Sequence, residues 1–399
     1  MNVDFLYGFL NLSFWSYVIV TFLMVQFTFM GVTLYLHRDA THRSLDLHPV
    51  LRHVFRFWLW MSSGIVTKEW VAVHRKHHAR CETQDDPHSP VIFGLKRVLL
   101  EGAELYQAQA RNPETTEKFG RGTPDDWMER NVYSRYRNYG IVALIVVDLL
   151  LFGLPGIIVL AVQLMANPVM AAGVINGIGH YYGYRNFECP DAARNIVPWG
   201  LLVAGEELHN NHHAFPSSAK FSIYRWEFDI GWMYIRVFQF FGLAKVIRVA
   251  PEPAHVEPRN HIDLETVRAV IVNRMHVLRA YTRHVTLPVF RDQLRMAGGT
   301  LSRRVRKLLV REPVLLDNTA QSRLREVLAS NQALQTVHEF RERLRQMWSG
   351  ANMSNEKLVQ HLKDWIAQAE ESRIKVLLSF VMQVASRSRA ASRRNPAAP

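Results

Sequence analysis

The feature that most constrains this chain is an uninterrupted apolar run near its N-terminus. Residues Phe14–Leu36 (FWSYVIVTFLMVQFTFMGVTLYL) contain no charged side chain. As a helix, this run is long enough to cross the hydrocarbon core of a bilayer, which is about 30 Å thick and needs about 20 apolar residues. Apolar stretches of this length are scarce in water-soluble domains, so the run predicts a membrane-spanning helix.

A second apolar stretch predicts a membrane hairpin. Gly140–Asn176 carries Asp148 as its single charged residue, and Gly153-Leu154-Pro155-Gly156 lies near its middle. Glycine and proline favour a turn, so we expect two shorter spanning helices joined there. The alternative is a buried core helix and a buried hairpin in a soluble protein, which the length of both stretches disfavours.

Histidine is concentrated in three clusters within the first 250 residues. They are His37-Arg-Asp-Ala-Thr-His42, His74-Arg-Lys-His77-His78 and His209-Asn-Asn-His212-His213. On a helix, the His-x-x-His-His spacing puts three imidazoles on one face. Neutral imidazole is the commonest metal-binding side chain and suits iron, zinc, copper and nickel. Eight clustered histidines exceed what one metal ion can use, so the clusters predict a dinuclear site.

Other functions for these clusters are disfavoured. A zinc hydrolase would need His-Glu-x-x-His or cysteine-rich spacing, and Cys81 and Cys189 lie in no such motif. A metal transporter or sensor predicts ionisable groups inside the spans, and Phe14–Leu36 has none. A solvated basic face or a pH sensor is the remaining alternative.

The three clusters can meet on one side of the membrane. Val50–Val66, between the first two clusters, contains Arg52, His53 and Arg56, which are costly at bilayer depth, so this stretch is expected to lie along the interface. The hairpin at 140–176 leaves and returns on the same side. That side is predicted to be cytoplasmic from the arginines that follow the first span: Arg38, Arg43, Arg52 and Arg56.

Charge divides the chain into two unlike parts. The whole chain carries 48 Lys and Arg against 35 Asp and Glu, a net charge of +13. Residues 251–399 contain 25 of the basic and 14 of the acidic residues, a net of +11, which leaves +2 for residues 1–250. The basic part could attract anionic lipid head groups or an acidic electron carrier, or it could be a helical bundle with a solvated basic face.

The basic part has the pattern of amphipathic helices. Leu264–Leu278 and Ser322–Trp348 place apolar residues three and four positions apart, which is typical of helices with one buried face. The last dozen or so residues (SRSRAASRRNPAAP) are predicted to be disordered. The expected fold class is an all-α integral membrane protein. Residues 1–250 would form a helical transmembrane bundle with a cytosolic, histidine-rich di-metal cap, and residues 251–399 a cytosolic helical extension.

The chain resembles the membrane fatty acid desaturases, in particular the acyl desaturase branch that includes the animal stearoyl-CoA enzymes and bacterial membrane desaturases. The resemblance runs from about Gly31 to Pro251. It rests on the three histidine boxes, on Asn176-Gly-Ile-Gly-His180 and on Asp85-Asp86-Pro87-His88 after the second box. Three boxes in this order are specific to the superfamily, in which hydroxylases and related oxygenases look similar.

The resemblance implies a di-iron site held by nine histidines, with Asn176 contributing through a water. The nine are His37, His42, His74, His77, His78, His180, His209, His212 and His213. Five carboxylates are candidates to accept the second N–H of ligand imidazoles: Glu69, Asp85, Asp86, Glu206 and Glu207. His48, His53 and His88 have no such support and are expected at the interface or behind the ligands.

The resemblance also implies an activity and its partners. We expect an O2-dependent desaturase of the bacterial inner membrane that introduces a cis double bond, at Δ9, into a saturated acyl chain; a hydroxylase with the same boxes is the alternative within the superfamily. The expected cofactors are two iron ions, which zinc can displace during expression because of its higher general affinity. The expected partners are membrane lipids, the acyl substrate and an external electron donor such as ferredoxin, rubredoxin or a b-type cytochrome with its reductase, but no nucleic acid. Ala72 and Val73 stand where the animal acyl-CoA branch has Arg-Asp, which leaves both acyl-CoA and phospholipid substrates open.

Overall fold

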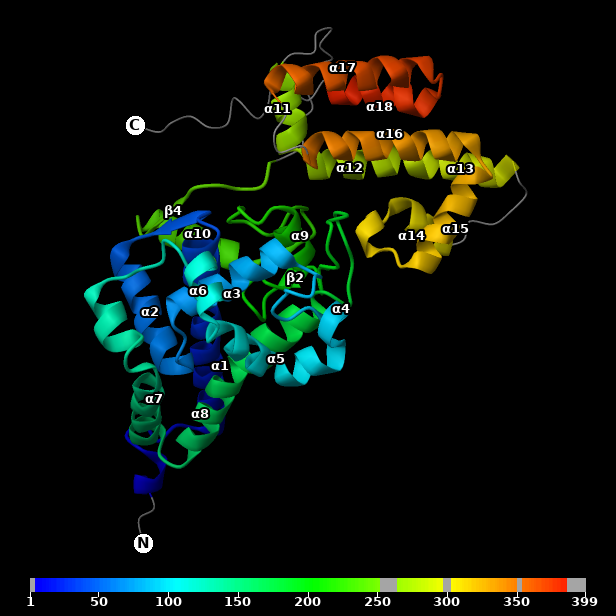
Figure 1. The fold of residues 1–399 in the computed structure, drawn as a ribbon. Coiled ribbons are helices and arrows are strands. Elements are labelled where there is room, and N and C mark those ends of the chain that lie inside the picture. The colour runs from blue at the N-terminus through cyan, green and yellow to red at the C-terminus, as the bar shows by residue number, and fades with distance from the viewer. Residues whose placement is uncertain (1–3, 252–263, 297–302, 350–353, 386–399) are drawn as a thin grey trace. The chain divides into compact units, whose positions relative to one another are not determined.

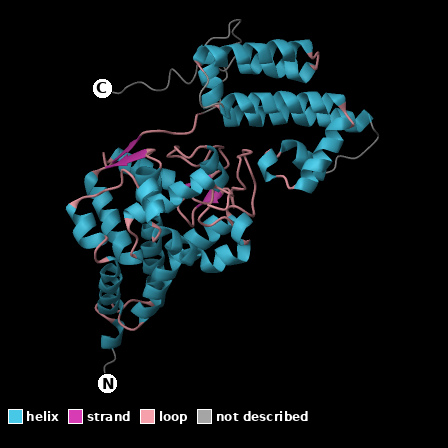
Figure 2. Ribbon diagram, viewed as in Figure 1, coloured by secondary structure: helices cyan, strands magenta, loops and turns pink. Residues whose placement is uncertain are grey.

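The computed structural model describes residues 4–251, 264–296, 303–349 and 354–385. Almost all of its regular structure is helical (Figures 1 and 2). The chain divides into two compact units: Met1–Arg185 with Ala192–Ala250, and Asn186–Asp191 with Pro251–Pro399. The segment predicted to be disordered at the C-terminus lies outside the described residues.

The first unit begins with the long apolar helix. After η1 (Asp4–Tyr7), α1 (Phe14–Met30) starts at Ser13, whose side chain accepts a hydrogen bond from the backbone N–H of Ser16. It runs without a break into the π-helical segment η2 (Gly31–Thr41). The continuous helix Phe14–Thr41 has 28 residues and is long and apolar enough to cross a membrane.

The second apolar stretch forms the expected helical hairpin. α7 (Arg137–Phe152) ends at Gly153, which has a positive φ of 63° that glycine adopts readily. α8 (Pro155–Ala166) then starts with proline, whose missing N–H is no loss in the first turn of a helix, and continues into π-helical η4 (Asn167–Ile178). Pro155–Ile178 has 24 residues and is the second described helix long and apolar enough to cross a membrane, whereas α7 has 16 residues.

Shorter elements surround the upper ends of these helices in Figure 1. The helical ones are α2 (Pro49–Ser63), α3 (Thr67–Arg80), α4 (Pro90–Phe93), α5 (Leu95–Ala110), α6 (Pro113–Phe119), η3 (Glu129–Tyr133), α9 (His209–Ala214) and α10 (Ile230–Phe240). Two short sheets add β1 (Leu45–Leu47) antiparallel to β4 (Ala244–Val246), and β2 (Trp199–Gly200) parallel to β3 (Phe228–Asp229).

The basic side chains of α2 are paired with carboxylates. Arg52 binds Asp39, with Nε 2.6 Å from Oδ2, and Arg56 binds Glu129, with Nη2 2.8 Å from Oε2. Arg56 also binds Asp126. On the same side of α2, Phe55 and Leu59 pack with Leu34 and Leu36 of η2 in one hydrophobic core. This packing fixes the end of the first long helix, where the first histidine box lies.

The second unit is a helical bundle with its own core. Its helices are α11 (Leu264–Val272), α12 (Arg274–Tyr281), η5 (Thr282–Thr286), α13 (Leu287–Met296), α14 (Arg303–Val310), η6 (Pro313–Leu315), α15 (Asn318–Ala329), α16 (Gln332–Ser349), α17 (Asn355–Glu371) and α18 (Lys375–Ala385). The core includes Tyr281, Phe340, Trp365 and Phe380. Each stretch predicted as an amphipathic helix is divided into two helices by a short break, at Asn273 and at residues 330–331.

Candidate metal centre

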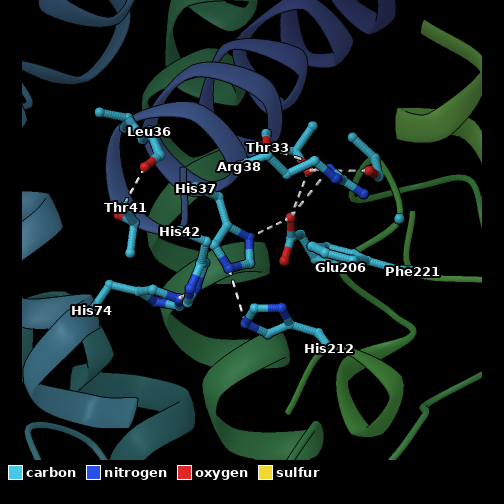
Figure 3. A network of polar contacts seen from close by, with 12 residues as sticks. Thr33, Leu36, His37, Arg38, Thr41, His42, His74, Glu206, His212 and Phe221 are labelled. Atoms are coloured by element: carbon cyan, nitrogen blue, oxygen red, sulfur yellow. Dashed lines mark hydrogen bonds and ion pairs between the residues drawn. The ribbon is translucent and has the colours of Figure 1, made fainter. Parts of the chain in front are cut away.

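A π-helical turn brings the first histidine pair together. His37 and His42 are five residues apart, which on an α-helix would turn them about 140° away from each other. The backbone N–H of His42 instead donates to the carbonyl of His37 over 3.0 Å, the wider bonding pattern of a π-helix. Their ring centroids lie 5.0 Å apart, and Figure 3 shows both rings at the end of this helix, facing His74 and His212.

α3 carries the second histidine cluster on one face. The ring of His74 stacks on Trp70, with centroids 5.0 Å apart and planes 14° from parallel, and lies 4.7 Å from the ring of His78. Arg75 ties α3 to the first box by donating to the carbonyl oxygens of Ala40, at 2.8 Å, and Thr41, at 3.2 Å. Arg75, which lies between the histidines of the second cluster, therefore helps to hold the first and second clusters together.

The third cluster and His180 complete the set. α9 contributes His209, His212 and His213, all buried. His180 follows η4, and its Nε2 lies 2.9 Å from Nε2 of His209. The structure thus brings all nine predicted ligand histidines into one region of the first unit.

Their ring nitrogens form two groups. In the first, the ligand atoms all lie within 4.8 Å of one another: His37, His42, His74, His78 and His212. In the second, the same holds for His77, His180, His213 and the sulfur of Cys81. His209 adjoins the second group through His180.

The nitrogen separations suit metal ligation. Within the first group, Nε2 of His37 and Nε2 of His212 are 3.0 Å apart, and the corresponding separation between His78 and His212 is 2.8 Å. Two imidazole nitrogens bound at right angles to one metal, each at about 2.0–2.1 Å, would be roughly 2.9 Å apart. The donor set, imidazole nitrogen with little else, is one that both iron and zinc accept.

Six of these histidines are held in the neutral form that metals require. Burial lowers the pKa of six of them well below the usual range, and the neighbouring histidines lower it further, because a proton on any one ring would repel a proton on the next. The six are His42, His74, His78, His209, His212 and His213.

Three buried carboxylates accept hydrogen bonds from the outer nitrogens of ligand rings. These pairs are Glu206 Oε1 with His37 Nδ1 at 2.8 Å, Asp86 Oδ1 with His77 Nδ1 at 3.0 Å, and Glu82 Oε1 with His180 Nδ1 at 2.9 Å. Burial alone would raise the pKa of each carboxyl group, but the adjacent histidine and the other donors and charges around it together hold the pKa below its usual range. Each carboxylate therefore stays charged and keeps the imidazole proton on Nδ1.

Glu82 was not among the carboxylates expected from the sequence. It sits in the turn after α3 with a positive φ of 62°, an uncommon conformation for a residue with a side chain. Its carboxylate also accepts the backbone N–H of Ala192 at 3.0 Å and the hydroxyl of Ser89 at 2.5 Å. The one sequence signal was its position just after the second box, which does not distinguish it from Asp85.

The remaining expected carboxylates have other partners. Glu69 forms an ion pair with Arg137, with Oε2 2.5 Å from Nη2. Glu207 accepts backbone N–H groups of the loop before it, among them that of Leu202 at 2.7 Å. Asp85 is exposed. The expectation that these three accept from ligand imidazoles is corrected, because their side chains are engaged in other contacts or face solvent.

A buried arginine supports Glu206 from behind. The side chain of Arg38 is fully buried, and its Nη1 lies 3.8 Å from Glu206 Oε1 while its Nη2 lies 3.2 Å from Asp229 Oδ1. The guanidinium covers the ring of Phe221 at 3.7 Å, and Thr33 donates to Glu206 Oε1 at 2.5 Å. Figure 3 shows Glu206 between His37 and Arg38, so the arginine fixes the carboxylate that orients His37.

The remaining residues singled out from the sequence are Asn176, His88, His48 and His53. Asn176 and His88 line the cavity described next. The ring of His88 stacks on His77 with centroids 4.4 Å apart, and its Nδ1 is buried with no hydrogen-bond partner in the described structure. Burial, together with His77, lowers the pKa of His88 to about 3. His48 caps the N-terminus of α2, and His53 is exposed.

A cavity of about 560 Å³ leads up to the histidines. His37, His74 and His209 form part of its wall, and apolar residues such as Phe29, Val32 and Ile175 form much of the rest. A largely apolar cavity ending at convergent histidines, in a helical protein with two candidate spanning helices, has the features of a membrane metalloenzyme with an apolar substrate.

Comparison with known proteins agrees with these features. Residues 13–228, more than half of the chain, match the family model described as fatty acid desaturase. The chain belongs to the fatty acid desaturase family, whose members are membrane-associated oxidoreductases acting on fatty acyl chains.

Individual relatives carry related names. A Δ9 acyl-lipid desaturase 2 of Arabidopsis thaliana is 29% identical over 243 residues, 60% of this chain and 76% of the relative. An sn-1 stearoyl-lipid 9-desaturase of Synechocystis is 31% identical over 247 residues, 60% and 74% of the two chains. An enzyme of the same name from Anabaena variabilis is 31% identical over 258 residues, 63% and 91%.

The second unit has a different similarity. Residues 265–391 match a family model described as transposase. This match covers less than a third of the chain and lies wholly outside the unit that contains the three histidine clusters.

Proposed function

We propose that this chain is an O2-dependent acyl desaturase that removes two hydrogens from a saturated fatty acyl chain and leaves a cis double bond at Δ9. The observation that carries the proposal is the meeting of two groups of convergent histidines with a largely apolar cavity. The relatives' names, which include Δ9 acyl-lipid and stearoyl-lipid 9-desaturases, support the reaction and its position.

The nine histidines would hold two irons. When bound there, iron supplies the oxidising power, drawn from O2, that unactivated methylene groups require. The chain's own part is to keep Nε2 free of a proton in three of these histidines, which Glu206, Asp86 and Glu82 do by binding Nδ1–H of His37, His77 and His180. Asn176, in the cavity wall, would contribute through a water.

The cavity supplies position. An acyl chain within it passes His37, His74 and His209, and its apolar wall keeps water from the carbons that react. Holding one pair of methylenes beside the centre fixes which carbons react and how they are oriented. Such positioning supplies a large part of the rate advantage of a bound reaction.

The proposal includes partners and a location. Electrons would come from an external donor such as ferredoxin, rubredoxin or a b-type cytochrome with its reductase. The substrate would be an acyl chain on CoA or on a phospholipid in the bacterial inner membrane, with the histidines and the C-terminus on the cytoplasmic side. Zinc would occupy the same nitrogens where iron is displaced.

The test is expression in a host that lacks its own desaturase, followed by mass spectrometry of the fatty acids in phospholipids and in the acyl-CoA pool. A loss of two hydrogens in one of these pools supports the proposal and identifies the carrier. An added oxygen in the product would instead indicate a hydroxylase, and no change in either pool with two bound irons would refute both.

Variants tie the product to the centre. His77→Ala and His212→Ala should abolish unsaturated product and lower the bound iron, because each removes a nitrogen from a different group. His53→Ala is the matched control, since His53 is exposed on α2. Full activity with two irons in either ligand variant would contradict the assignment.

The absence of a nucleic-acid partner stays a prediction. The transposase match and the net positive charge of residues 251–399 make it worth testing with the full chain in detergent. We expect no shift of duplex DNA in a gel at physiological salt, where purely electrostatic binding is weak.

A further inference from the structure

Cys81 is the member of the second group of ligand atoms that is not a histidine. It follows His77 by four residues at the end of α3, so the two side chains lie one helical turn apart. His180 and His213 reach the same place from the end of η4 and from α9. Side chains from three separate elements thus converge on one point, with Sγ of Cys81 within 4.8 Å of each of the three ligand nitrogens.

The separation between Cys81 and His77 suits two ligands of one metal ion. Sγ lies 3.8 Å from Nε2 of His77. A thiolate sulfur bound at about 2.3 Å and an imidazole nitrogen bound at about 2.0–2.1 Å, at the angles of a tetrahedral or trigonal site, would be roughly 3.6–3.8 Å apart. Asp86 binds Nδ1 of His77, so Nε2 is the nitrogen left without a proton and able to bind the same ion.

A hydrogen bond to Glu82 is the other role open to Cys81. Sγ lies 4.0 Å from Oε1 of Glu82, to which a thiol can donate. That oxygen already accepts from Nδ1 of His180, at 2.9 Å, and from the backbone N–H of Ala192, at 3.0 Å. A thiol is a weak donor, so a third and longer contact to the same oxygen adds little.

Charge favours a thiolate at this place. Two divalent cations would bring four positive charges into a buried site, and the three carboxylates that bind ligand histidines offset three of them. The buried Arg38 adds no net charge, because it is paired with Asp229. A Cys81 thiolate would supply the fourth negative charge within the centre, where uncompensated charge is costly.

We propose that Cys81, as a thiolate, is a ligand of the second metal position together with His77, His180 and His213. This inference rests on the proposed metal centre. As the sulfur–metal bond forms, the S–H bond breaks and its proton passes to solvent, which the partly exposed Cys81 can reach.

The thiolate would make the two metal positions unlike each other. The ligand atoms of the first group are all imidazole nitrogens, whereas those of the second include a sulfur. Thiolate is a soft ligand that selects zinc, and imidazole suits zinc and iron alike. The second position should therefore prefer zinc over iron more strongly than the first does.

The test is titration of the metal-free full chain in detergent with Co²⁺, followed by absorption spectroscopy. A thiolate bound to cobalt gives a near-ultraviolet charge-transfer band that imidazole ligands do not give. The chain has two cysteines, and Cys189 is buried outside both groups, so Cys189→Ala is the matched control and leaves Cys81 as its single thiol. We expect the band in the wild type and in Cys189→Ala, and its loss in Cys81→Ser.

Cys81→Ser also separates ligation from hydrogen bonding. Serine keeps an O–H that can donate to Glu82, but it is a much poorer ligand for zinc. We expect the zinc affinity of the second position to fall at least about 10-fold, the lower end of what the loss of even an indirect partner of a metal costs. The ferrous affinity should fall less, because iron gains less from a soft ligand. Equal zinc affinity in Cys81→Ser and the wild type would assign Cys81 to the hydrogen bond and overturn the inference.

The spectra separate failure of this inference from failure of the metal centre. Two cobalt ions bound by the wild type without the band would overturn the ligand role of Cys81 and leave the histidine centre standing. A band that persists in Cys81→Ser would assign the thiolate to Cys189 and also overturn the inference. A wild type that retains neither cobalt nor iron would overturn the proposed centre itself. If Cys81→Ser does not fold, the band in Cys189→Ala decides, because its single thiol is Cys81.

Discussion

Glu82 offers the sharpest test of how the centre is held. It is the carboxylate that orients His180, and it does so from a left-handed backbone conformation, with φ at 62°. Replacing it with alanine removes the carboxylate and keeps the unfavourable backbone. Replacing it with glycine removes the carboxylate and relieves the backbone, so the pair separates the two effects at one position.

The magnitudes follow from these contacts. Losing the carboxylate leaves the Nδ1–H of His180, the N–H of Ala192 and the Ser89 hydroxyl without their acceptor, at about 1–3 kcal/mol for each donor that water cannot reach. A left-handed residue other than glycine costs about 1–2 kcal/mol. Glu82→Gly should therefore be more stable than Glu82→Ala by about 1 kcal/mol, with both less stable than the wild type.

Metal affinity should behave differently. Removing the acceptor behind a ligand histidine typically lowers metal affinity 10- to 100-fold, and this loss should be the same in both variants, because the side chain that orients His180 is absent from both. It should also be confined to the second group of ligands, since Glu82 has no bond to the first.

The assay is titration of the metal-free protein with ferrous iron against a coloured chelator, alongside thermal unfolding of the metal-free protein in detergent. We expect one tight and one weakened site in both variants. The reasoning is refuted if both variants retain two tight sites, or if affinity falls in proportion to stability and differs between alanine and glycine.

Three further predictions concern residues that are not predicted metal ligands. Arg38→Met should lower the unfolding free energy by about 3–5 kcal/mol in chemical denaturation, because it leaves Asp229 and Glu206 buried without their cation; Arg43→Met, at an exposed position, is the control. The bond from Arg56 lowers the pKa of Asp126 to about 2, so its stabilising effect should be present above about pH 4 and be lost as the pH falls through about 2; thermal midpoints of Asp126→Asn and wild type should differ at pH 6 and converge near pH 2. Trp365→Ala should destabilise the second unit by about 3–5 kcal/mol, seen as faster amide exchange there with unchanged iron content.

The sequence predicted the elements that depend only on neighbouring residues. Gly153 and Pro155 end and begin helices for reasons of backbone geometry alone, and the hairpin forms where they stand. The His-x-x-His-His spacing of α3 puts its rings on one face whatever surrounds it. The ligand assignments themselves came from resemblance, and the structure adds that the side chains converge; metal binding by them stays a prediction.

Features that depend on tertiary packing could not be predicted from the sequence. The π-helical end of the first long helix, which makes His37 and His42 neighbours, depends on packing around η2, and no residue pattern distinguishes it from an α-helix. Glu69 and Arg137 are 68 residues apart, so their pairing could not be read from spacing. Glu82 was missed because its role requires a left-handed turn that the sequence gives no reason to place there.

The placement of the carboxylates also has a consequence for charge. Nine neutral imidazoles around two divalent cations would leave about four positive charges in a buried site, which is costly unless anions lie nearby. Glu206, Asp86 and Glu82 are buried or nearly so, and each binds the Nδ1 of one predicted ligand histidine. With metal bound, they would compensate its charge through the histidines and would not themselves be ligands. Converting one of these carboxylates to its amide, for example Glu206→Gln, should therefore weaken iron binding without removing a ligand nitrogen, whereas replacing its histidine partner with alanine removes that nitrogen and should lower the bound iron further.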